Sequence, residues 1–220
     1  MKDKKTHSKF FRVFNFKLFF LDCARFLYML SYPFLRVKKF GLDKKRYKGK
    51  LKGAMILACN HSSFTDAPLI GSSFFYRRVY FLTAKEVMDT KLKNILLKGA
   101  GCIKIDRNNT DIKAIRECVE VLKDGRILCL FPQGMIEKTD SLNQVKSGFV
   151  LIATNAKVPI LPIYSEKRKN IFKTRKMVIG KPINVSDCFS KRMPSVDDIE
   201  LAADALLQAL EDCKKVFDEI

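Results

Sequence analysis

Short, fully apolar runs and longer amphipathic stretches alternate along most of this chain. An apolar run bounded by turn residues is typical of a strand buried on both faces, and a 3.6-residue period is typical of a helix that covers a sheet. The alternation predicts an α/β fold with a mixed, mostly parallel sheet flanked by helices. The predicted strands are 54–60, 79–83, 102–105, 126–131, 159–164 and 177–179, and the predicted helices are 85–97, one from Asn109 or Thr110 to Gly125, 148–156 and 195–217.

Polar clusters follow three of the predicted strands. Residues 60–66 follow the first strand, Asp106 and Arg107 follow 102–105, and residues 132–134 follow 126–131. The carboxyl ends of parallel strands share one edge of a sheet, and α/β sheets place their sites there. The sequence therefore predicts a site at this edge.

His61 and Asp66 are the candidates for catalysis. A histidine suits general base chemistry because its ordinary pKa lies near neutrality, but it needs a partner that fixes its tautomer. Asp66 is the nearest carboxylate, although positions five apart on a helix point about 140° away from each other, so the chain must turn between them. Pro68 suits a first helical turn just after it. The spacing leaves an alternative open, in which Asp66 only caps a helix and His61 bonds to backbone.

Three basic residues are candidates for binding an anion. The Arg107 guanidinium could bind a phosphate with two hydrogen bonds, or could pair with Asp106. Lys104 alternates with apolar neighbours and could face substrate or solvent. Lys146 precedes a predicted helix and could add positive charge to an anion site, or be solvated.

Charge and aromatic residues are concentrated near the N-terminus. The net charge of the chain is +19, and residues 1–52 contain 16 Lys and Arg but only three acidic residues, a net of +13. Nine of the 18 phenylalanines lie between Phe10 and Phe40. We therefore expect two parts, a basic, aromatic N-terminal segment with its linker (1–52) and an α/β domain (53–220), and we expect an anionic partner.

The N-terminal segment is predicted to lie on an anionic lipid surface. Its longest uncharged run, Phe26–Leu35, has ten residues and contains a proline. The segment has neither the uninterrupted apolar core and small-residue cleavage site of a signal sequence nor the roughly 20 apolar residues of a spanning helix. Helical, aromatic and basic character favours an interfacial helix, hence a peripheral or monotopic protein on the cytoplasmic face of a membrane. Packing of these aromatics on the domain is the alternative. No nucleic-acid-binding signature is present.

Cysteine usage indicates neither disulfides nor a metal site. The seven cysteines are scattered, without a CxxC pair or a metal-ligand spacing, and three fall in or beside apolar runs. We expect reduced core residues in a cytosolic compartment.

Several short blocks resemble those of the glycerolipid acyltransferases, the family of 1-acylglycerol-3-phosphate acyltransferases. Residues 60–66, Asn-His-Ser-Ser-Phe-Thr-Asp, resemble the family's NHxSxxD signature. Agreement of many motifs in order is more specific than one match. The other blocks, in the family's order, are Ala84–Val87 (AKxEL, shortened by one), Gly101–Arg107 (GxIxIDR), Phe131–Gly134 (FPEG), Lys146–Gly148 (KxG) and Val158–Ile163 (VPIxP).

The resemblance implies transfer of an acyl group to a lysophospholipid. His61, oriented by Asp66, would remove the proton of the lysolipid hydroxyl as that oxygen attacks an acyl thioester, and would then protonate the leaving thiolate. The donor substrate is expected to be acyl-CoA or acyl carrier protein, with no cofactor and no metal. The implied substrate-binding residues are Arg107 with Lys104 for the phosphate, and Gln133, Gly134 and Lys146.

Two positions depart from the family pattern. Gln133 stands where the family has glutamate and keeps its shape without its charge. Ile136 stands where an arginine is expected, so one anion contact is missing. The acceptor is therefore expected to be 1-acylglycerol-3-phosphate, giving phosphatidic acid, with another lysolipid, such as an amino-acid-linked one, as the alternative. A catalytically impaired basic membrane-binding module and a thioester hydrolase are the other hypotheses.

Overall fold

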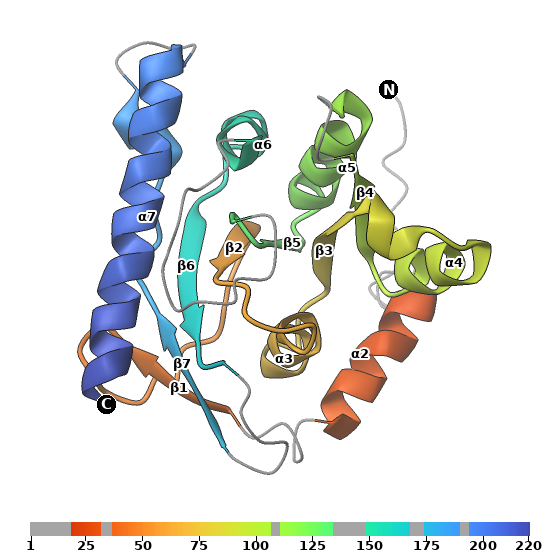
Figure 1. Ribbon diagram of the computed structural model, residues 1–220, viewed down its shortest axis with the longest axis horizontal. Helices are drawn as coiled ribbons and strands as arrows, with labels where there is room; N and C mark the ends of the chain where they lie inside the picture. Colours follow the sequence, from red (N-terminus) through yellow and green to blue (C-terminus); the bar gives the residue numbers. More distant parts are fainter. Residues whose placement is uncertain (1–18, 32–36, 107–110, 134–147, 168–173, 190–193) are drawn as a thin grey trace, which may run out of the picture.

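The fold is a sheet between two layers of helices, as seen in a computed structural model that describes residues 19–31, 37–106, 111–133, 148–167, 174–189 and 194–220 (Figure 1). The strands are β1 (Val37–Gly41), β2 (Met55–Cys59), β3 (Val79–Ala84), β4 (Cys102–Ile105), β5 (Ile127–Leu130), β6 (Ile160–Ser165) and β7 (Arg175–Ile179). The helices are α2 (Phe19–Ser31), α3 (Asp66–Ser73), α4 (Lys91–Gly99), α5 (Ile112–Lys123), α6 (Gly148–Ala156) and α7 (Val196–Glu219), with 3₁₀ turns η2 (Lys85–Met88) and η3 (Val185–Cys188).

The sheet is mixed and mostly parallel, which confirms the predicted fold class. Its strand order is β1-β7-β6-β2-β5-β3-β4. Strands β2 to β6 are mutually parallel, whereas β7 pairs antiparallel with β6 and parallel with β1. One edge of the sheet, the catalytic rim, therefore carries the carboxyl ends of five strands together with the amino end of β7.

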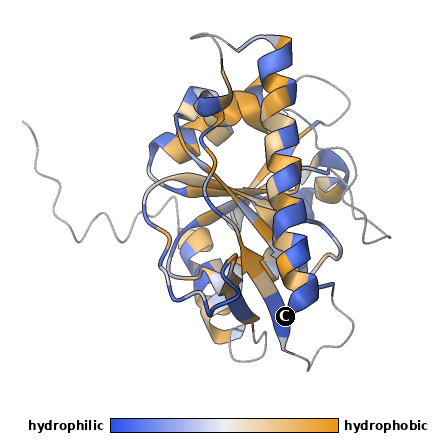
Figure 2. Ribbon diagram, turned by 90° about the vertical axis from the view of Figure 1, so that its left-hand side faces the viewer, coloured by the Kyte–Doolittle hydropathy of each residue, from blue (hydrophilic) through white to orange (hydrophobic). Residues whose placement is uncertain are grey.

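Strand β2 lies at the centre of the core. All five of its residues are buried, as its apolar run predicts. Ile56 and Ala58 pack with α5, α6 and α7 on one face of the sheet, and Leu57 and Cys59 pack with α3 on the other. The central strands are correspondingly apolar in Figure 2. A strand buried on both faces fixes the position of the residues that follow it.

Most predicted elements are present, with ends that coincide with the prediction or differ from it by one to three residues. The prediction of one continuous helix over residues 85–97 was wrong. The segment forms two elements, η2 and α4, because Thr90 Oγ1 caps the start of α4 by accepting the Lys93 N–H at 3.3 Å. Helix α5 is capped by Asp111, which accepts the Ala114 N–H at 3.0 Å, instead of by a residue at 109 or 110, and those two positions lie outside the described residues. Helix α7 has the predicted capping box of Ser195 and Asp198.

The predicted N-terminal segment contains a strand that the pattern did not reveal. Strand β1, with two lysines in five residues, pairs with β7 at the edge of the sheet. Helix α2 also packs on the domain, because Asp22 pairs with Arg78 at 2.8 Å and the ring of Tyr28 lies against Gly71. Within the part of the chain that the structure describes, no helix has the length and apolar character needed to cross a bilayer.

Candidate active site

A tight turn between β2 and α3 brings His61 and Asp66 together. Asp66 Oδ2 accepts the backbone N–H groups of Ser62 and Ser63, both at 2.8 Å. The same oxygen lies 3.2 Å from His61 Nδ1. The chain thus turns between the two residues, as their spacing requires, and the alternative in which His61 bonds only to backbone does not describe this geometry.

Arg175 holds the other oxygen of the Asp66 carboxylate. Its Nη2 lies 2.9 Å from Asp66 Oδ1, and both side chains are almost completely buried. The guanidinium also donates to the carbonyl of Glu166, from Nε at 2.9 Å, and to Thr65 Oγ1 at 3.3 Å. The sequence analysis missed Arg175. A basic residue at the start of an apolar strand was the available signal, but only the antiparallel direction of β7 brings that start to the catalytic rim.

These contacts determine the protonation of the pair. Burial by itself would raise the pKa of Asp66, but hydrogen bonds from His61, Arg175 and the backbone of Ser62 and Ser63 lower it below its usual value. An ionised carboxylate can only accept hydrogen bonds, so His61 Nδ1 carries the proton that it donates to Asp66. The other ring nitrogen, Nε2, is therefore left unprotonated in the neutral imidazole and can accept a proton.

The β5 loop fixes the imidazole from the other side. The His61 ring stacks on Phe131, with ring centroids 4.0 Å apart and planes 18° apart. The backbone N–H of His61 donates to Gln133 Oε1 at 3.2 Å, and Gln133 is buried. Gln133 thus positions the main chain of His61 through its side-chain oxygen. Glutamine and glutamate both have an oxygen at this place in the side chain. Its predicted contact with substrate stays a prediction.

Asn60 joins β2 to β6 just before His61. Its Oδ1 accepts the Ser165 N–H at 2.7 Å, and its Nδ2 donates to the Ser165 carbonyl at 3.0 Å. Both residues are buried, so the backbone groups of Ser165 need partners. The Asn60 side-chain amide supplies the hydrogen bonds that one more residue pair between β2 and β6 would make. The asparagine that opens the motif therefore has a structural role in setting where His61 begins.

Lys104 lies further along the catalytic rim. It is exposed on β4, in a hollow of about 320 Å³ that Lys85 and Lys98 also line, and Lys85 pairs there with Asp106 at 2.6 Å. Strand β4 is three strands from β2, about 14 Å at the usual strand spacing. Lys104 therefore does not contact His61, and a role in binding requires a substrate that extends along the rim.

Three predicted binding residues, Arg107, Gly134 and Lys146, lie outside the described residues, as does Ile136, and their roles stay predictions. Among the residues that are described, no group of three or more His, Cys, Asp or Glu is placed to hold a metal ion.

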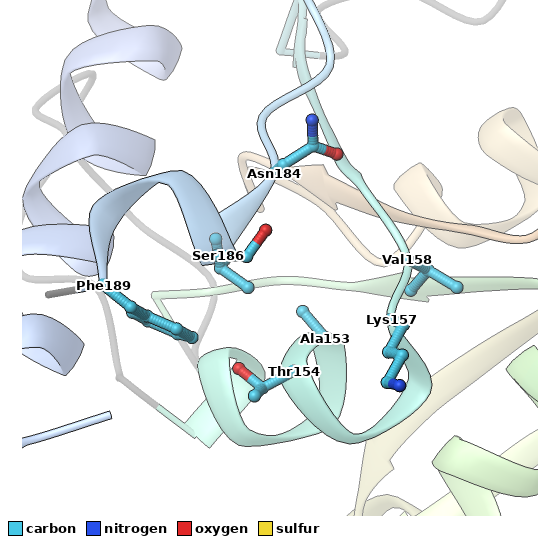
Figure 3. A pocket seen from close by; sticks show the side chains of 8 residues that line it. Ala153, Thr154, Lys157, Val158, Asn184, Ser186 and Phe189 are labelled. Carbon is cyan, nitrogen blue, oxygen red and sulfur yellow. The ribbon is translucent and has the colours of Figure 1, made fainter. Parts of the chain in front are cut away.

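A second hollow, of about 310 Å³, lies away from the catalytic rim. It is formed between the end of α6 and η3, and its lining includes Thr154, Lys157, Asn184 and Phe189 (Figure 3). Lys157 lies three residues before the amino end of β6, which is at the opposite edge of the sheet from His61. This hollow has no part in the site described above.

Comparison with known proteins identifies the family. The family model described as Acyltransferase matches residues 37–166. A 1-acyl-sn-glycerol-3-phosphate acyltransferase of Bacillus subtilis is 27% identical over 170 residues, which cover 75% of this chain and 83% of that protein. An enzyme of the same description from Streptococcus pneumoniae is 30% identical over 138 residues, 60% of this chain and 51% of that protein.

Two further relatives bear on the acceptor and on the fold. A lyso-ornithine lipid O-acyltransferase of Pseudomonas aeruginosa is 31% identical over 117 residues, 53% of this chain and 44% of that protein. The crystal structure of the 1-acyl-sn-glycerophosphate acyltransferase PlsC from Thermotoga maritima has the same fold, with a TM-score of 0.60 at 19% identity over 90% of this chain and 81% of that one. The family model covers more than half of the chain, and the chain therefore belongs to the glycerolipid acyltransferases that its sequence motifs indicate.

Proposed function

We propose that this acyltransferase moves an acyl group from acyl-CoA or acyl carrier protein to the free hydroxyl of a lysophospholipid at a membrane surface. The observation that carries the proposal is the His61–Asp66 pair, in which a buried, ionised carboxylate engages Nδ1 and leaves Nε2 to accept a proton. A base of this kind is what attack by an alcohol on a thioester requires.

The reaction needs one proton transfer in each direction. His61 Nε2 takes the hydroxyl proton as the lysolipid oxygen bonds to the thioester carbonyl carbon, and Asp66 stabilises the resulting imidazolium. The carbon–sulfur bond then breaks, and His61 returns the proton to the thiolate. Ser62 Oγ, shielded from solvent beside His61 and without a hydrogen-bond partner among the described residues, is a candidate donor to the oxyanion. No metal or cofactor is required.

The proposed acceptor is 1-acylglycerol-3-phosphate, and the product phosphatidic acid. The support is the descriptions of the Bacillus and Streptococcus relatives. The description of the Pseudomonas relative favours the amino-acid-linked lysolipid as the second candidate. Arg107, Lys104, Gly134 and Lys146 are proposed to contact the acceptor.

The membrane part of the proposal is supported by α2. This helix presents large apolar side chains to solvent, among them Phe20, Phe26, Leu27 and Leu30, while its Leu21 is buried against the domain. An outward apolar face next to a strongly basic N-terminal sequence suits the headgroup region of an anionic membrane. We propose peripheral or monotopic attachment on the cytoplasmic face.

The test is an acceptor screen with labelled acyl-CoA and acyl carrier protein, read by mass spectrometry. Wild-type protein should acylate 1-acylglycerol-3-phosphate, and His61→Ala should lower turnover by about 10²- to 10⁴-fold, the contribution of a general base. Asp66→Asn should also lose turnover, because it removes the charge that stabilises the imidazolium. A matched control is His7→Ala, which removes the other histidine.

Full activity of His61→Ala would contradict the proposal. Release of free fatty acid without acceptor would instead favour the thioester hydrolase. Absence of transfer to any lysolipid would favour the catalytically impaired module.

A further inference from the structure

Helix α4 turns its apolar side toward solvent. None of its nine residues is buried, and Leu92, Ile95 and Leu96 are 67%, 68% and 61% exposed. At 100° per residue, these three side chains and Gly99 lie within an arc of about 100°. A helix that stabilised the fold by packing would have this stripe against the core. The exposed stripe therefore indicates a contact outside the protein.

The α4 stripe is continuous with the exposed face of α2. The two helices are in contact on one flank of the domain, where α4 lies at one end of α2 (Figure 1). A Cβ at Gly99 would lie 3.0 Å from Phe20 Cβ, so the middle of the α4 stripe touches the edge of the α2 face. Phe20, Leu27 and Leu30 lie within an arc of about 80° on α2, whereas Leu21 and Tyr28, about 80° to 180° away around the helix, lie against the domain.

Lysines border the α4 stripe on both sides. Lys91 and Lys98 lie within about 60° of Ile95 on one side, and Lys93 lies about 60° beyond Leu96 on the other. The helix itself has no acidic residue. An apolar centre with a cationic border complements a bilayer with anionic headgroups, because the apolar side chains enter the acyl boundary and the ammonium groups reach the phosphates.

We propose that α4 is a second membrane-docking element, far in sequence from the N-terminal segment, and that α2 and α4 together form one face that binds an anionic lipid bilayer. This inference rests on the membrane-surface part of the proposed function. It adds that the α/β domain itself contacts the lipid, so that two tethering points limit rotation of the catalytic rim relative to the bilayer.

The experiment uses the full chain and vesicles of phosphatidylcholine and phosphatidylglycerol in equal parts, with co-sedimentation as the readout. The variant Leu92→Gln, Ile95→Gln, Leu96→Gln keeps helix propensity and removes three exposed side chains, so it should fold as the wild type does. We expect about 100-fold weaker vesicle binding from partial burial of the three lost side chains. The matched control is Val196→Gln with Leu201→Gln, two exposed apolar residues of α7 on the far side of the sheet, which should leave binding unchanged.

A second variant tests the charge. Replacing Lys91, Lys93 and Lys98 by Gln should weaken binding to the anionic vesicles by about 100-fold, since each lysine near such a surface contributes about fivefold, and should have little effect on pure phosphatidylcholine vesicles. The wild type should accordingly lose affinity as salt is raised.

Acyl transfer to detergent-dispersed lysolipid separates the two proposals. A Leu92→Gln, Ile95→Gln, Leu96→Gln variant that loses vesicle binding but retains this activity supports α4 docking. Unchanged vesicle binding in both α4 variants overturns it, whether or not the wild type is active. A change from dimer to monomer in sedimentation velocity, with vesicle binding unchanged, also overturns it and assigns the face to a second copy of the chain. Absence of activity in the wild type counts against the proposed function alone.

Discussion

Arg175→Met is the substitution that best tests how the site is held together. It removes a guanidinium that donates to Asp66, Thr65 and the carbonyl of Glu166, and replaces it by a chain of similar length. The Asp66 carboxylate, which is fully buried, then keeps three N–H donors on Oδ2 but loses the cation on Oδ1. Both stability and chemistry should respond.

The expected cost can be worked from this geometry. Removing one partner of a buried ion pair destabilises a protein by about 3–5 kcal/mol, because the other charge stays buried without compensation. The pKa of Asp66 should rise in the variant, because one of the interactions that lower it is lost while its burial remains. A carboxylate and imidazole displaced by about 1 Å should lower kcat by about 100-fold with a smaller change in KM.

Urea unfolding and pH profiles of acyl transfer measure these effects. We expect a lower unfolding midpoint, and an acidic limb of the kcat profile that moves to higher pH. Arg175→Lys should restore part of the stability, since it returns the charge but not the planar fork. Arg116→Met removes the same charge from an exposed position of α5 and should change neither quantity.

Two results would refute this account of Arg175. Unchanged stability of Arg175→Met would mean that the ion pair contributes nothing. A loss of activity that follows the unfolded fraction, with an unmoved pH profile, would mean that Arg175 supports the fold without positioning Asp66.

Three further predictions concern the same turn and its surroundings. Asn60→Ala leaves the buried N–H and carbonyl of Ser165 without their partners, so it should lower the free energy of unfolding by about 1–3 kcal/mol per group and reduce kcat. Urea unfolding and acyl transfer measure these two effects. An unchanged midpoint of urea unfolding would contradict the prediction. The pKa of Asp66 is lower in the folded state than in the unfolded state, so the stability that comes from this difference is fully present above the unfolded pKa and is lost as pH falls from about 5 toward the folded pKa. The decline of stability at acid pH should therefore be shallower in Asp66→Asn than in the wild type. Equal slopes in the two proteins would count against this prediction. In Gly71→Ala, the new Cβ would lie 2.6 Å from the Tyr28 ring and push α2 off α3, so the free energy of unfolding should fall by about 1–3 kcal/mol, whereas Gly53→Ala, which meets no neighbour but has a positive φ, reports the backbone cost alone.

Local sequence determined the elements of this fold because each is encoded by its own periodicity. The apolar run of β2, the amphipathic pattern of α7 and its Ser195 capping box all act over a few residues and can be recognised without the fold. The pairing of His61 with Asp66 could also be predicted from the sequence. Only a turn can bring together residues with that spacing, and a turn depends on the residues within it.

Edge strands and the solvent-facing sides of helices were harder to predict from the sequence. Strand β1 carries two lysines because an edge strand needs to bury little, so its pattern resembled that of the basic segment around it. The stripe of α4 reads as an ordinary amphipathic helix, and only the packing reveals that its apolar side faces solvent.

The sequence by itself therefore determined the α/β class, the family and the His61–Asp66 turn. The tertiary structure alone decided that Arg175, more than 100 residues later in the chain, completes the carboxylate site. The physical reason is strand direction: reversing β7 relative to β6 moves its first residue from the far edge of the sheet to the catalytic rim, and pairing direction depends on long-range hydrogen bonds that leave no periodic signal in the sequence.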